Sequence, residues 1–426
     1  MNKLFVITTG TASVQWMFFI FANTVVVPVS IGAAFGLPPA ETAMILRSSL
    51  IFTGIACVLQ GWIGHRYPLM EGHSGLMWGL LLTLSASAGA LGMDYHVIGG
   101  GIATGVIAAG GVMAVMGALK MAPWLNHIFT PMVTNVYLFL LAVQLIIIFF
   151  TGMLKVNEDG AIDPAGSFFS VCVVIAVAIM KIKGKGWISN FSILIGITAG
   201  WALYVLLFPG EAAGSAEASP FFLFPLGTPN LQWGIVIASF VTGLINMSNT
   251  IASVQAASQL YKEKAEEKKY NHSFFLTGVY TIASAPLGLV PYAPYTSSLG
   301  FLESTRIYER PPFIIGGLLL SLLGIVPAAG TFLAGIPVTV GSAVLFVAYM
   351  QLFGTALKSL QVVSFNSNTI FRIAVPVLVG ISIMAIDPKL FSSLPLMIQP
   401  LLTNGMATGV ILSIILEKMV KWHNYE

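Results

Sequence analysis

Two ionisable side chains, Glu71 and His73, stand two residues apart between two apolar stretches of the chain. They belong to a short polar segment with helix breakers that begins at Tyr67. In an extended strand, residues two apart share one face, so the carboxyl and imidazole groups could act as a coupled pair. An ionisable group inside a membrane is a functional candidate by default, and we hypothesise that Glu71 loads and releases a proton beside His73. The alternative is a structural ion pair of Glu71 with Arg47 or Arg66.

A second set of polar residues follows helical spacing within the apolar stretch 232–256: Thr242, Asn246, Asn249 and Ser253. Steps of four, three and four residues place all of them on one face of a helix. A carboxamide both donates and accepts, so Asn246 and Asn249 could bind a ligand that carries an N–H group beside a C=O group. The alternative, hydrogen bonding between helices, contributes about 0.6 kcal/mol per pair and is favoured for Ser253.

Hydroxyl side chains precede two further apolar stretches, 74–92 and 296–310. Ser74, and either Thr296 or Ser297, are candidate N-caps of helices that begin there. The free N–H groups and positive dipole of such helix ends attract a carbonyl oxygen or an anion. The alternative is that these residues only cap helices. We expect the substrate to bind at these two helix starts. The predicted substrate-binding residues are Glu71, His73, Ser74, Gly75, Asn246, Asn249, Tyr295, Thr296, Ser297 and Ser298.

The composition requires a membrane environment for these residues. The chain has 426 residues, of which 57% are hydrophobic and 8% charged, and its mean hydropathy is +0.89. A soluble domain has about 25% charged residues, so a soluble globular protein, a disordered chain and a nucleic-acid binder are all excluded. The net charge of +3 provides no strongly basic face. We expect a polytopic, all-α membrane protein that needs no cofactor and no metal.

Apolar stretches of about 17–25 residues predict fourteen transmembrane spans. They lie at 13–32, 41–62, 74–92, 96–118, 128–153, 167–182, 187–208, 232–256, 272–290, 296–310, 312–330, 337–357, 367–386 and 396–419. With the N-terminus inside, sixteen of the nineteen Lys and Arg residues fall in cytoplasmic segments. This asymmetry indicates a multi-pass protein of the cell membrane with both termini in the cytoplasm.

The third and tenth spans are both preceded by polar, breaker-rich segments. Their numbers differ by seven, as two repeats of seven spans require, and an odd number of spans inverts the second repeat. Interrupted spans at matching positions indicate the binding site of a secondary transporter. The stretches that begin at Thr130 and Ile336 also share a Pro near the start and Gln-Leu near the end, which supports two related halves.

Several segments make the chain resemble the nucleobase:cation symporter-2 family, the nucleobase–ascorbate transporters, and in particular bacterial uracil and xanthine permeases. The resemblance covers nearly the whole chain. It is carried by Val14-Gln-Trp-Met-Phe-Phe-Ile-Phe-Ala-Asn-Thr-Val-Val-Val-Pro28, Pro68-Leu-Met-Glu-Gly-His-Ser74, Ser298-Leu-Gly-Phe-Leu-Glu-Ser-Thr-Arg306 and Ile336-Pro337.

The resemblance implies a seven-plus-seven inverted repeat with half-helices at spans 3 and 10. A core domain would comprise residues 1–122 and 230–332, and a gate domain residues 123–229 and 333–426. The substrate would bind between the two domains, and the protein would be a homodimer. Two family acids align with Asn246 and Ser297, which cannot ionise, so this is a divergent member. We hypothesise that Glu71 takes over their coupling role.

The expected function is secondary active transport of a nucleobase such as uracil, xanthine or another purine. Symport with a proton, or with sodium in its place, would work by alternating access. The partners would then be a nucleobase, the coupling ion and the lipid bilayer, with no nucleic acid. An anion exchanger or uniporter on the same fold, and an uncoupled nucleobase facilitator, stay open as alternatives. A membrane enzyme is disfavoured because neither paired acids nor a His-x-x-x-His spacing is found.

Overall fold

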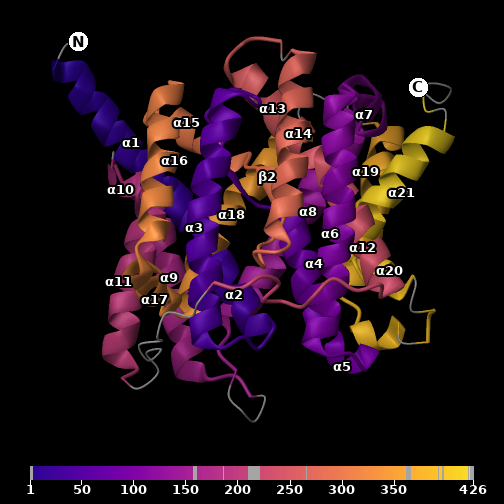
Figure 1. The fold of residues 1–426 in the computed structure, drawn as a ribbon, viewed down its shortest axis with the longest axis horizontal. Helices are drawn as coiled ribbons and strands as arrows, with labels where there is room; N and C mark the ends of the chain where they lie inside the picture. Colours follow the sequence, from indigo (N-terminus) through magenta and orange to yellow (C-terminus); the bar gives the residue numbers. More distant parts are fainter. Residues whose placement is uncertain are drawn as a thin grey trace.

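The fold is a bundle of helices, most of which run along a common direction (Figure 1). It is seen in a computed structural model that describes residues 3–156, 161–185, 187–209, 221–264, 266–360, 366–391, 393–395, 398–420 and 422. The first half contains α1 (Lys3–Thr24), α2 (Val26–Ala34), α3 (Pro39–Trp62), β1 (Glu71–His73), α4 (Gly75–Ala86), α5 (Ala88–Leu91), α6 (Tyr95–Ala118), α7 (Ala122–Ile128), α8 (Pro131–Met153), α9 (Pro164–Lys183), α10 (Trp187–Asn190) and α11 (Ser192–Leu207).

The second half contains α12 (Trp233–Ile245), α13 (Met247–Leu260), α14 (Glu267–Ser284), β2 (Tyr292–Pro294), α15 (Ser297–Thr305), α16 (Arg310–Ile325), α17 (Pro327–Ala334), α18 (Val338–Leu360), α19 (Ser367–Met384), the 3-10 helix η1 (Pro388–Phe391), α20 (Gln399–Leu402) and α21 (Gly405–Met419). Residues 396 and 397, at the start of the last predicted span, lie outside the described residues.

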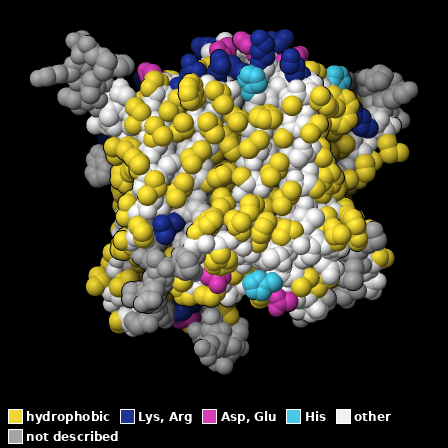
Figure 2. All heavy atoms as spheres, viewed as in Figure 1, with side chains coloured by type: hydrophobic (Ala, Val, Ile, Leu, Met, Phe, Trp, Pro, Cys, Tyr) yellow, Lys and Arg dark blue, Asp and Glu magenta, His cyan; other side chains and the backbone are white. Residues whose placement is uncertain are grey.

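Seven helical segments among the described residues are long and apolar enough to cross a bilayer. They are Thr9–Ala34, Pro39–Trp62, Tyr95–Ala118, Pro131–Met153, Pro164–Lys183, Trp233–Leu260 and Ser367–Met384. Hydrophobic side chains cover the middle of the face seen in Figure 2, and Lys and Arg gather at its upper end. The chain is therefore a multi-pass membrane protein, whereas the count of fourteen spans stays a prediction.

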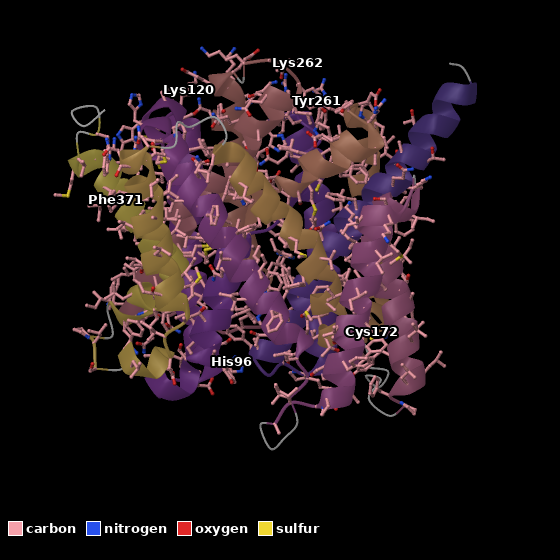
Figure 3. All side chains as sticks on the ribbon, turned by 180° about the vertical axis from the view of Figure 1, so that it is seen from behind. His96, Lys120, Cys172, Tyr261, Lys262 and Phe371 are labelled. Atoms are coloured by element: carbon pink, nitrogen blue, oxygen red, sulfur yellow. The ribbon has the colours of Figure 1, made fainter. Side chains whose placement is uncertain are left out.

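The end of the bundle that carries these basic residues is called the basic face below. Lys120 and Lys262 lie there, whereas His96 and Cys172 lie toward the opposite end (Figure 3). The α1 helix begins, and α21 ends, on the basic face (Figure 1). Lys120 and Lys262 adopt left-handed backbone angles, with φ of 57° and 54°.

Several predicted spans are divided or shortened in the structure. The first predicted span, 13–32, is divided into α1 and α2, because Pro28 has no N–H to donate to the carbonyl of Thr24, where α1 ends. The predicted span 296–310 is only nine residues long as α15, and 74–92 is twelve residues long as α4. At 1.5 Å per residue, α4 and α15 are about 18 and 14 Å long, well short of the hydrocarbon core of about 30 Å.

The helices pack as two sets. In the first set, α1 and α3 pack against α16, and α6 packs against both α12 and α14. In the second set, α8 packs against α18 and α21, α9 against α11, and α19 against α21. Glycines permit the closest contacts: a Cβ atom on Gly278 of α14 would collide with the backbone of Ala114 on α6. Such close approach of backbones stabilises helix pairs in lipid.

The short helices of the first set each follow a strand. The strands β1 and β2 pair antiparallel, with His73 opposite Tyr292 and Glu71 opposite Pro294. Two further backbone hydrogen bonds extend the pairing: Ser74 N donates to Pro291 O (2.7 Å) and Tyr295 N donates to Met70 O (2.8 Å). The pair is buried throughout. It therefore brings the starts of α4 and α15 together inside the bundle.

Candidate functional site

An open cavity lies where the starts of α4 and α15 face the second set of helices. The first set contributes polar groups, and the second set contributes a mainly apolar wall with two polar side chains. The cavity is lined by Phe19, Asn23, Gly75, Asn249, Tyr295, Thr296, Ser297 and Phe301 from the first set, and by Leu141, Leu145, Lys181, Ile193, Ala348 and Tyr349 from the second. This mixture suits a small, planar, polar ligand.

The first residues of the two short helices, Gly75 of α4 and Ser297 of α15, both line the cavity. Ser74 is the N-cap of α4, and its Oγ accepts a hydrogen bond from Met77 N (3.3 Å), as predicted. At α15 the capping position is Thr296, whose side chain forms no capping hydrogen bond. The buried hydroxyl of Ser297 has no hydrogen-bond partner among the described residues. It is thus free to bind a ligand.

The two asparagines of the predicted polar face occupy different places. Asn246 is 1% exposed, and both ends of its carboxamide are engaged: Nδ2 donates to Tyr292 O (2.9 Å), and Oδ1 accepts from Ser74 Oγ (2.6 Å). It is not part of the cavity lining, whereas Asn249 is. On the same face, Ser253 Oγ donates to Pro294 O (2.9 Å), which is the structural role favoured for it. Thr242 Oγ1 is buried with no partner among the described residues.

Glu71 and His73 share one face of β1, and that face points away from the cavity toward α3 and α14. His73 is fixed between two partners: Nδ1 donates to Val290 O (3.1 Å), since a carbonyl can only accept, and Nε2 therefore accepts from Ser49 Oγ (2.6 Å). Glu71 is fully buried. Its Oε1 accepts from Thr277 Oγ1 (3.1 Å), and its Oε2 has no partner among the described residues.

The alternative ion pair of Glu71 is not found among the described residues. Arg47 Nε and Nη2 donate to the carbonyl oxygens of Gly324 and Ile325, each at 3.5 Å, and Arg66 is exposed. A buried carboxyl group without a cationic partner is expensive to keep ionised, which favours exchange of a proton at this position.

Two other predicted residues hold the strand pair in place. Tyr295 lines the cavity, and its hydroxyl donates to His73 O (2.7 Å). Ser298 is not part of the lining; its Oγ accepts from Met70 N (2.9 Å) ahead of β1. The cavity and the buried face of β1 are thus connected through Tyr295.

Three polar residues of the lining were not predicted: Asn23, Lys181 and Tyr349. Asn23 lies within the segment that carries the family resemblance, which was a usable signal. Lys181 ends a long apolar helix and was assigned to a cytoplasmic segment. Tyr349 of the second set lines the same cavity as Tyr295 of the first set, and nothing in the sequence links these two positions.

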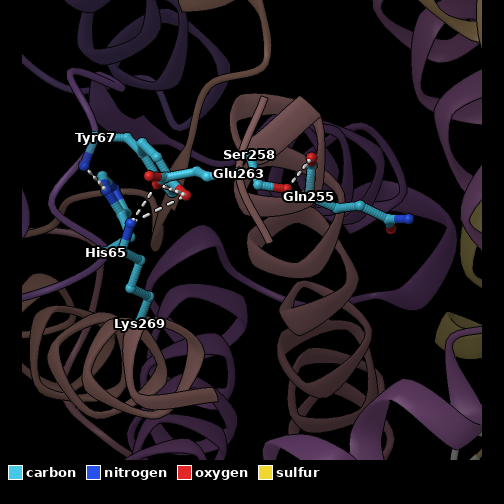
Figure 4. Close-up of polar contacts among 6 residues, drawn as sticks. All are labelled: His65, Tyr67, Gln255, Ser258, Glu263 and Lys269. Carbon is cyan, nitrogen blue, oxygen red and sulfur yellow. Dashed lines mark hydrogen bonds and ion pairs between the residues drawn. The ribbon is translucent and has the colours of Figure 1, made fainter. Parts of the chain in front are cut away.

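A separate polar cluster lies on the basic face, and we call Tyr67, Glu263 and Lys269 the surface cluster (Figure 4). Lys269 Nζ donates to Glu263 Oε1 (2.6 Å) and to Tyr67 OH (3.1 Å), and Tyr67 OH donates to Glu263 Oε1 (2.7 Å). The Lys269 ammonium also lies 4.2 Å from the centre of the Tyr67 ring. These contacts join the segment before β1 to the start of α14.

Comparison with known proteins identifies the class to which this fold and cavity belong. Residues 8–389 match the model of the permease family named Xan_ur_permease. The transmembrane domain of a cyanobacterium bicarbonate transporter, BicA, has the same fold, with a TM-score of 0.60 at 14% identity over 83% of this chain and 95% of that one. The murine anion transporter Slc26a9 in an inward-facing state gives a TM-score of 0.62 at 11% identity, over 95% and 68% of the two chains. The protein is thus a membrane transporter and not an enzyme.

The relatives in sequence narrow this class. A putative purine permease of Bacillus subtilis, YwdJ, is 28% identical over 96% of this chain and 95% of its own length. The uric acid permease PucJ of the same organism is 24% identical over 95% and 91%, and its xanthine permease 22% identical over 96% and 92%. The chain belongs to the Xan_ur_permease family, that is, the nucleobase:cation symporter-2 family, as the sequence motifs predicted.

Proposed function

We propose that this protein is a nucleobase permease that carries uracil, xanthine or another purine into the cell together with a proton. The support comes from the family and from relatives named as purine, uric acid and xanthine permeases. The observation that carries the proposal is the cavity in which Asn249, Thr296 and Ser297 face an apolar wall. It combines shape for a flat ring with donors and acceptors for its edge.

Base recognition would use the edge and the face of the ring separately. The Asn249 carboxamide can donate to a ring carbonyl and accept from the neighbouring ring N–H. The backbone N–H groups at the starts of α4 and α15 can donate to a second carbonyl. Tyr295 and Tyr349 are placed to contact the ring face. An amide at Asn246 leaves this recognition intact, because that side chain bonds to Ser74 and Tyr292 instead.

The transport cycle would follow alternating access in a fold of fourteen spans. We assign residues 1–122 and 230–332 to a core domain and residues 123–229 and 333–426 to a gate domain, with half-helices at α4 and α15. The separate packing of the two helix sets supports this division. The core would move against the gate with the base bound between them, in a homodimer of the cell membrane whose termini are cytoplasmic.

Coupling would reside at Glu71, with His73 fixing the strand beside it. Protonation of Glu71 would alter β1, and β1 is joined to the cavity by the hydrogen bond from Tyr295 OH to His73 O. The base and the proton would therefore bind on opposite faces of the same strand pair. Proton coupling in this arrangement does not require a carboxyl group in the cavity that binds the base.

The direct test is uptake of labelled uracil and xanthine into proteoliposomes with and without an inward proton gradient. We expect a gradient to stimulate uptake by the native protein. The Glu71→Gln variant should lose this stimulation but retain exchange of labelled for unlabelled base. Wild-type rates and unchanged pH dependence in Glu71→Gln would refute the coupling role, and uptake that ignores the gradient in the native protein would indicate a facilitator.

Anion transport is the second candidate, because the described residues that line the cavity include Lys181 and no carboxyl group. Competition separates the two functions. A nucleobase permease is inhibited by unlabelled bases and not by sulfate or bicarbonate, and an anion exchanger shows the reverse. The Lys181→Gln variant should abolish sulfate or bicarbonate transport if the second candidate is correct and should alter base uptake far less.

A further inference from the structure

The carboxyl group of Glu71 has no contact with the base cavity, so a proton must reach it by another path. Its side chain points to α14, where Thr277 Oγ1 donates to Oε1 (3.1 Å). The other titratable groups around it are engaged elsewhere or are weak donors. Tyr280 OH donates to Ala56 O (3.4 Å), Tyr292 OH bonds to Thr53 (2.9 Å), and His73 bonds to Ser49 and Val290. Cys57 packs its thiol against the backbone of Glu71.

Hydrogen bonds continue from Thr277 toward the basic face. Gln60 Nε2 donates to Thr277 Oγ1 (3.1 Å) and to the carbonyl of Ser273 (3.4 Å). Because that carbonyl can only accept, the orientation of the Gln60 amide is fixed. Its Oε1 then accepts from His65 N (3.4 Å). The Thr277 hydroxyl receives a hydrogen bond from Gln60, so its own hydrogen is directed at Glu71.

We call His65, Gln60, Ser273 and Thr277 the polar track. Every one of these side chains is fully buried. Ser273 and Thr277 lie six and ten residues from the start of α14, or about 9 and 15 Å along it. His65 lies at the outer end, next to the surface cluster (Figure 4), where its Nδ1 accepts from Tyr67 N (3.1 Å). The track thus extends from the surface cluster to the level of Glu71.

Unpartnered polar atoms mark both ends and the middle of this track. They are His65 Nε2, Ser273 Oγ and Glu71 Oε2, each buried and without a partner among the described residues. Since Nδ1 of His65 accepts a hydrogen bond, Nε2 of the neutral ring carries its hydrogen. Buried polar groups of this kind are usually satisfied by water. Apolar side chains would have filled the same space at lower cost if the region served only packing.

We propose that Glu71 exchanges its proton with the cytoplasm along the polar track, through the interior of the first helix set and not through the base cavity. The inference rests on the proposed proton-coupled transport. In the step that protonates Glu71, the Thr277 hydroxyl gives its hydrogen to Oε1 and takes one from a water molecule on the Ser273 side. That water regains a proton from the water beyond it, so the last proton in the relay enters from the cytoplasm. The net change is one proton added to Glu71, with no electrons transferred, and Gln60 keeps its own hydrogens and orients Thr277.

The test compares variants on the same face of α14 in proteoliposomes with an internal pH dye. Thr277→Val removes the relaying hydroxyl and should slow base-induced proton entry at least about tenfold, while exchange of labelled for unlabelled base stays within about twofold. Thr277→Ser should restore proton entry. Thr281→Val is the matched control, since Thr281 is one turn further from the basic face, equally buried, and forms no hydrogen bond through its hydroxyl to described residues.

Wild-type proton entry in Thr277→Val, or equal loss of proton entry and base exchange, would overturn the route. If Thr277→Val does not fold, Ser273→Ala provides the same test, because that hydroxyl has no protein partner to lose among the described residues. A native protein whose base uptake moves no protons would instead refute the proposed coupling, so the two failures are distinguishable. Stimulation by sodium at constant pH would also overturn the proposal.

Discussion

The hydroxyl of Ser74 donates a 2.6 Å hydrogen bond to the carboxamide oxygen of Asn246. The amide nitrogen of Asn246 donates in turn to the Tyr292 carbonyl. One side chain thus joins the cap of α4 to the strand that precedes α15. An aspartate at this position could keep the first bond, but it would present a second acceptor to the carbonyl. The asparagine is therefore matched to its neighbours as a donor, and its role is to hold the two short helices in register.

We expect Asn246→Ala to lower the free energy of unfolding by about 1–3 kcal/mol, because the Ser74 hydroxyl hydrogen loses its acceptor and the buried Tyr292 carbonyl loses its donor. Asn249→Ala should leave stability nearly unchanged and raise the apparent KM for base by up to about tenfold. Thermal unfolding in detergent and uptake kinetics measure the two effects. A loss of affinity without a loss of stability in Asn246→Ala would place that residue in the binding site instead.

Glycine substitutions on neighbouring helices should have opposite effects. Gly278→Ala places a methyl group against the backbone of Ala114 and must separate α14 from α6, so we expect destabilisation by at least about 1 kcal/mol. Gly111→Ala, on α6, meets no atom within 4 Å and should stabilise by about 0.5–1 kcal/mol. Melting temperatures of the two variants check the pair. If both variants change the melting temperature by the same amount, the close contact between α6 and α14 does not contribute to stability as predicted.

The surface cluster should make stability depend on pH. The hydrogen bond from Lys269 holds the pKa of the Glu263 carboxyl below its usual range. A lowered folded-state pKa stabilises the fold above the unfolded value of about 4.3, and this stabilisation is lost as the pH falls through the folded value. Because Glu263 is 46% exposed, we expect Glu263→Gln to cost less than about 1 kcal/mol at pH 7.

The difference between native protein and Glu263→Gln should vanish below about pH 4, as followed by thermal unfolding at each pH. Glu266→Gln is the control, since Glu266 forms no ion pair with described residues. A constant difference down to pH 3 would mean that the carboxylate charge does not stabilise the cluster.

The proposed orientation predicts which ends of the bundle react from which side of the membrane. Single cysteines replacing Lys120 or Lys262 should react with an impermeant maleimide only from the cytoplasm, in a background without Cys57 and Cys172. A cysteine replacing His96, toward the opposite end (Figure 3), should react only from outside. Labelling of whole cells against inside-out vesicles measures this. Reaction of all three positions from one side would contradict the predicted span count.

Patterns in the sequence predicted the class of protein. The length of the apolar stretches and the unequal distribution of Lys and Arg between loops are set by the bilayer and not by particular contacts between residues. They also predicted where α4 and α15 start and that Ser74 caps α4. The orientation of β1 could not be predicted. Alternation shows that Glu71 and His73 share a face, but which face meets the cavity depends on pairing with β2, 220 residues away in sequence.

The same limit applies to Asn246 and Asn249. Helical spacing places both residues on one face of a helix. It does not show that Asn246 forms hydrogen bonds within the first helix set whereas Asn249 lines the cavity. Likewise, Tyr349 of α18 and Tyr295, just before α15, line one cavity only because the two helix sets meet there. Contacts between the two helix sets depend on the tertiary arrangement, and local periodicity carries no information about them.

The left-handed residues Lys120 and Lys262 have a consequence for how the chain enters the membrane. Each of these lysines lies in the turn that ends a helix. At Lys120 this turn is closed by two backbone hydrogen bonds, from Lys120 N to Gly117 O and from Met121 N to Met116 O. The left-handed position of such a turn is usually occupied by glycine. A residue with a side chain pays about 1 kcal/mol to adopt the left-handed backbone conformation, so glycine at these positions would make the folded protein more stable. In the proposed orientation both residues lie on the cytoplasmic side, where positive charge retains a loop on the side of the ribosome during biosynthesis. The proposed orientation therefore implies that correct insertion of the nascent chain is secured at some expense to the stability of the mature protein.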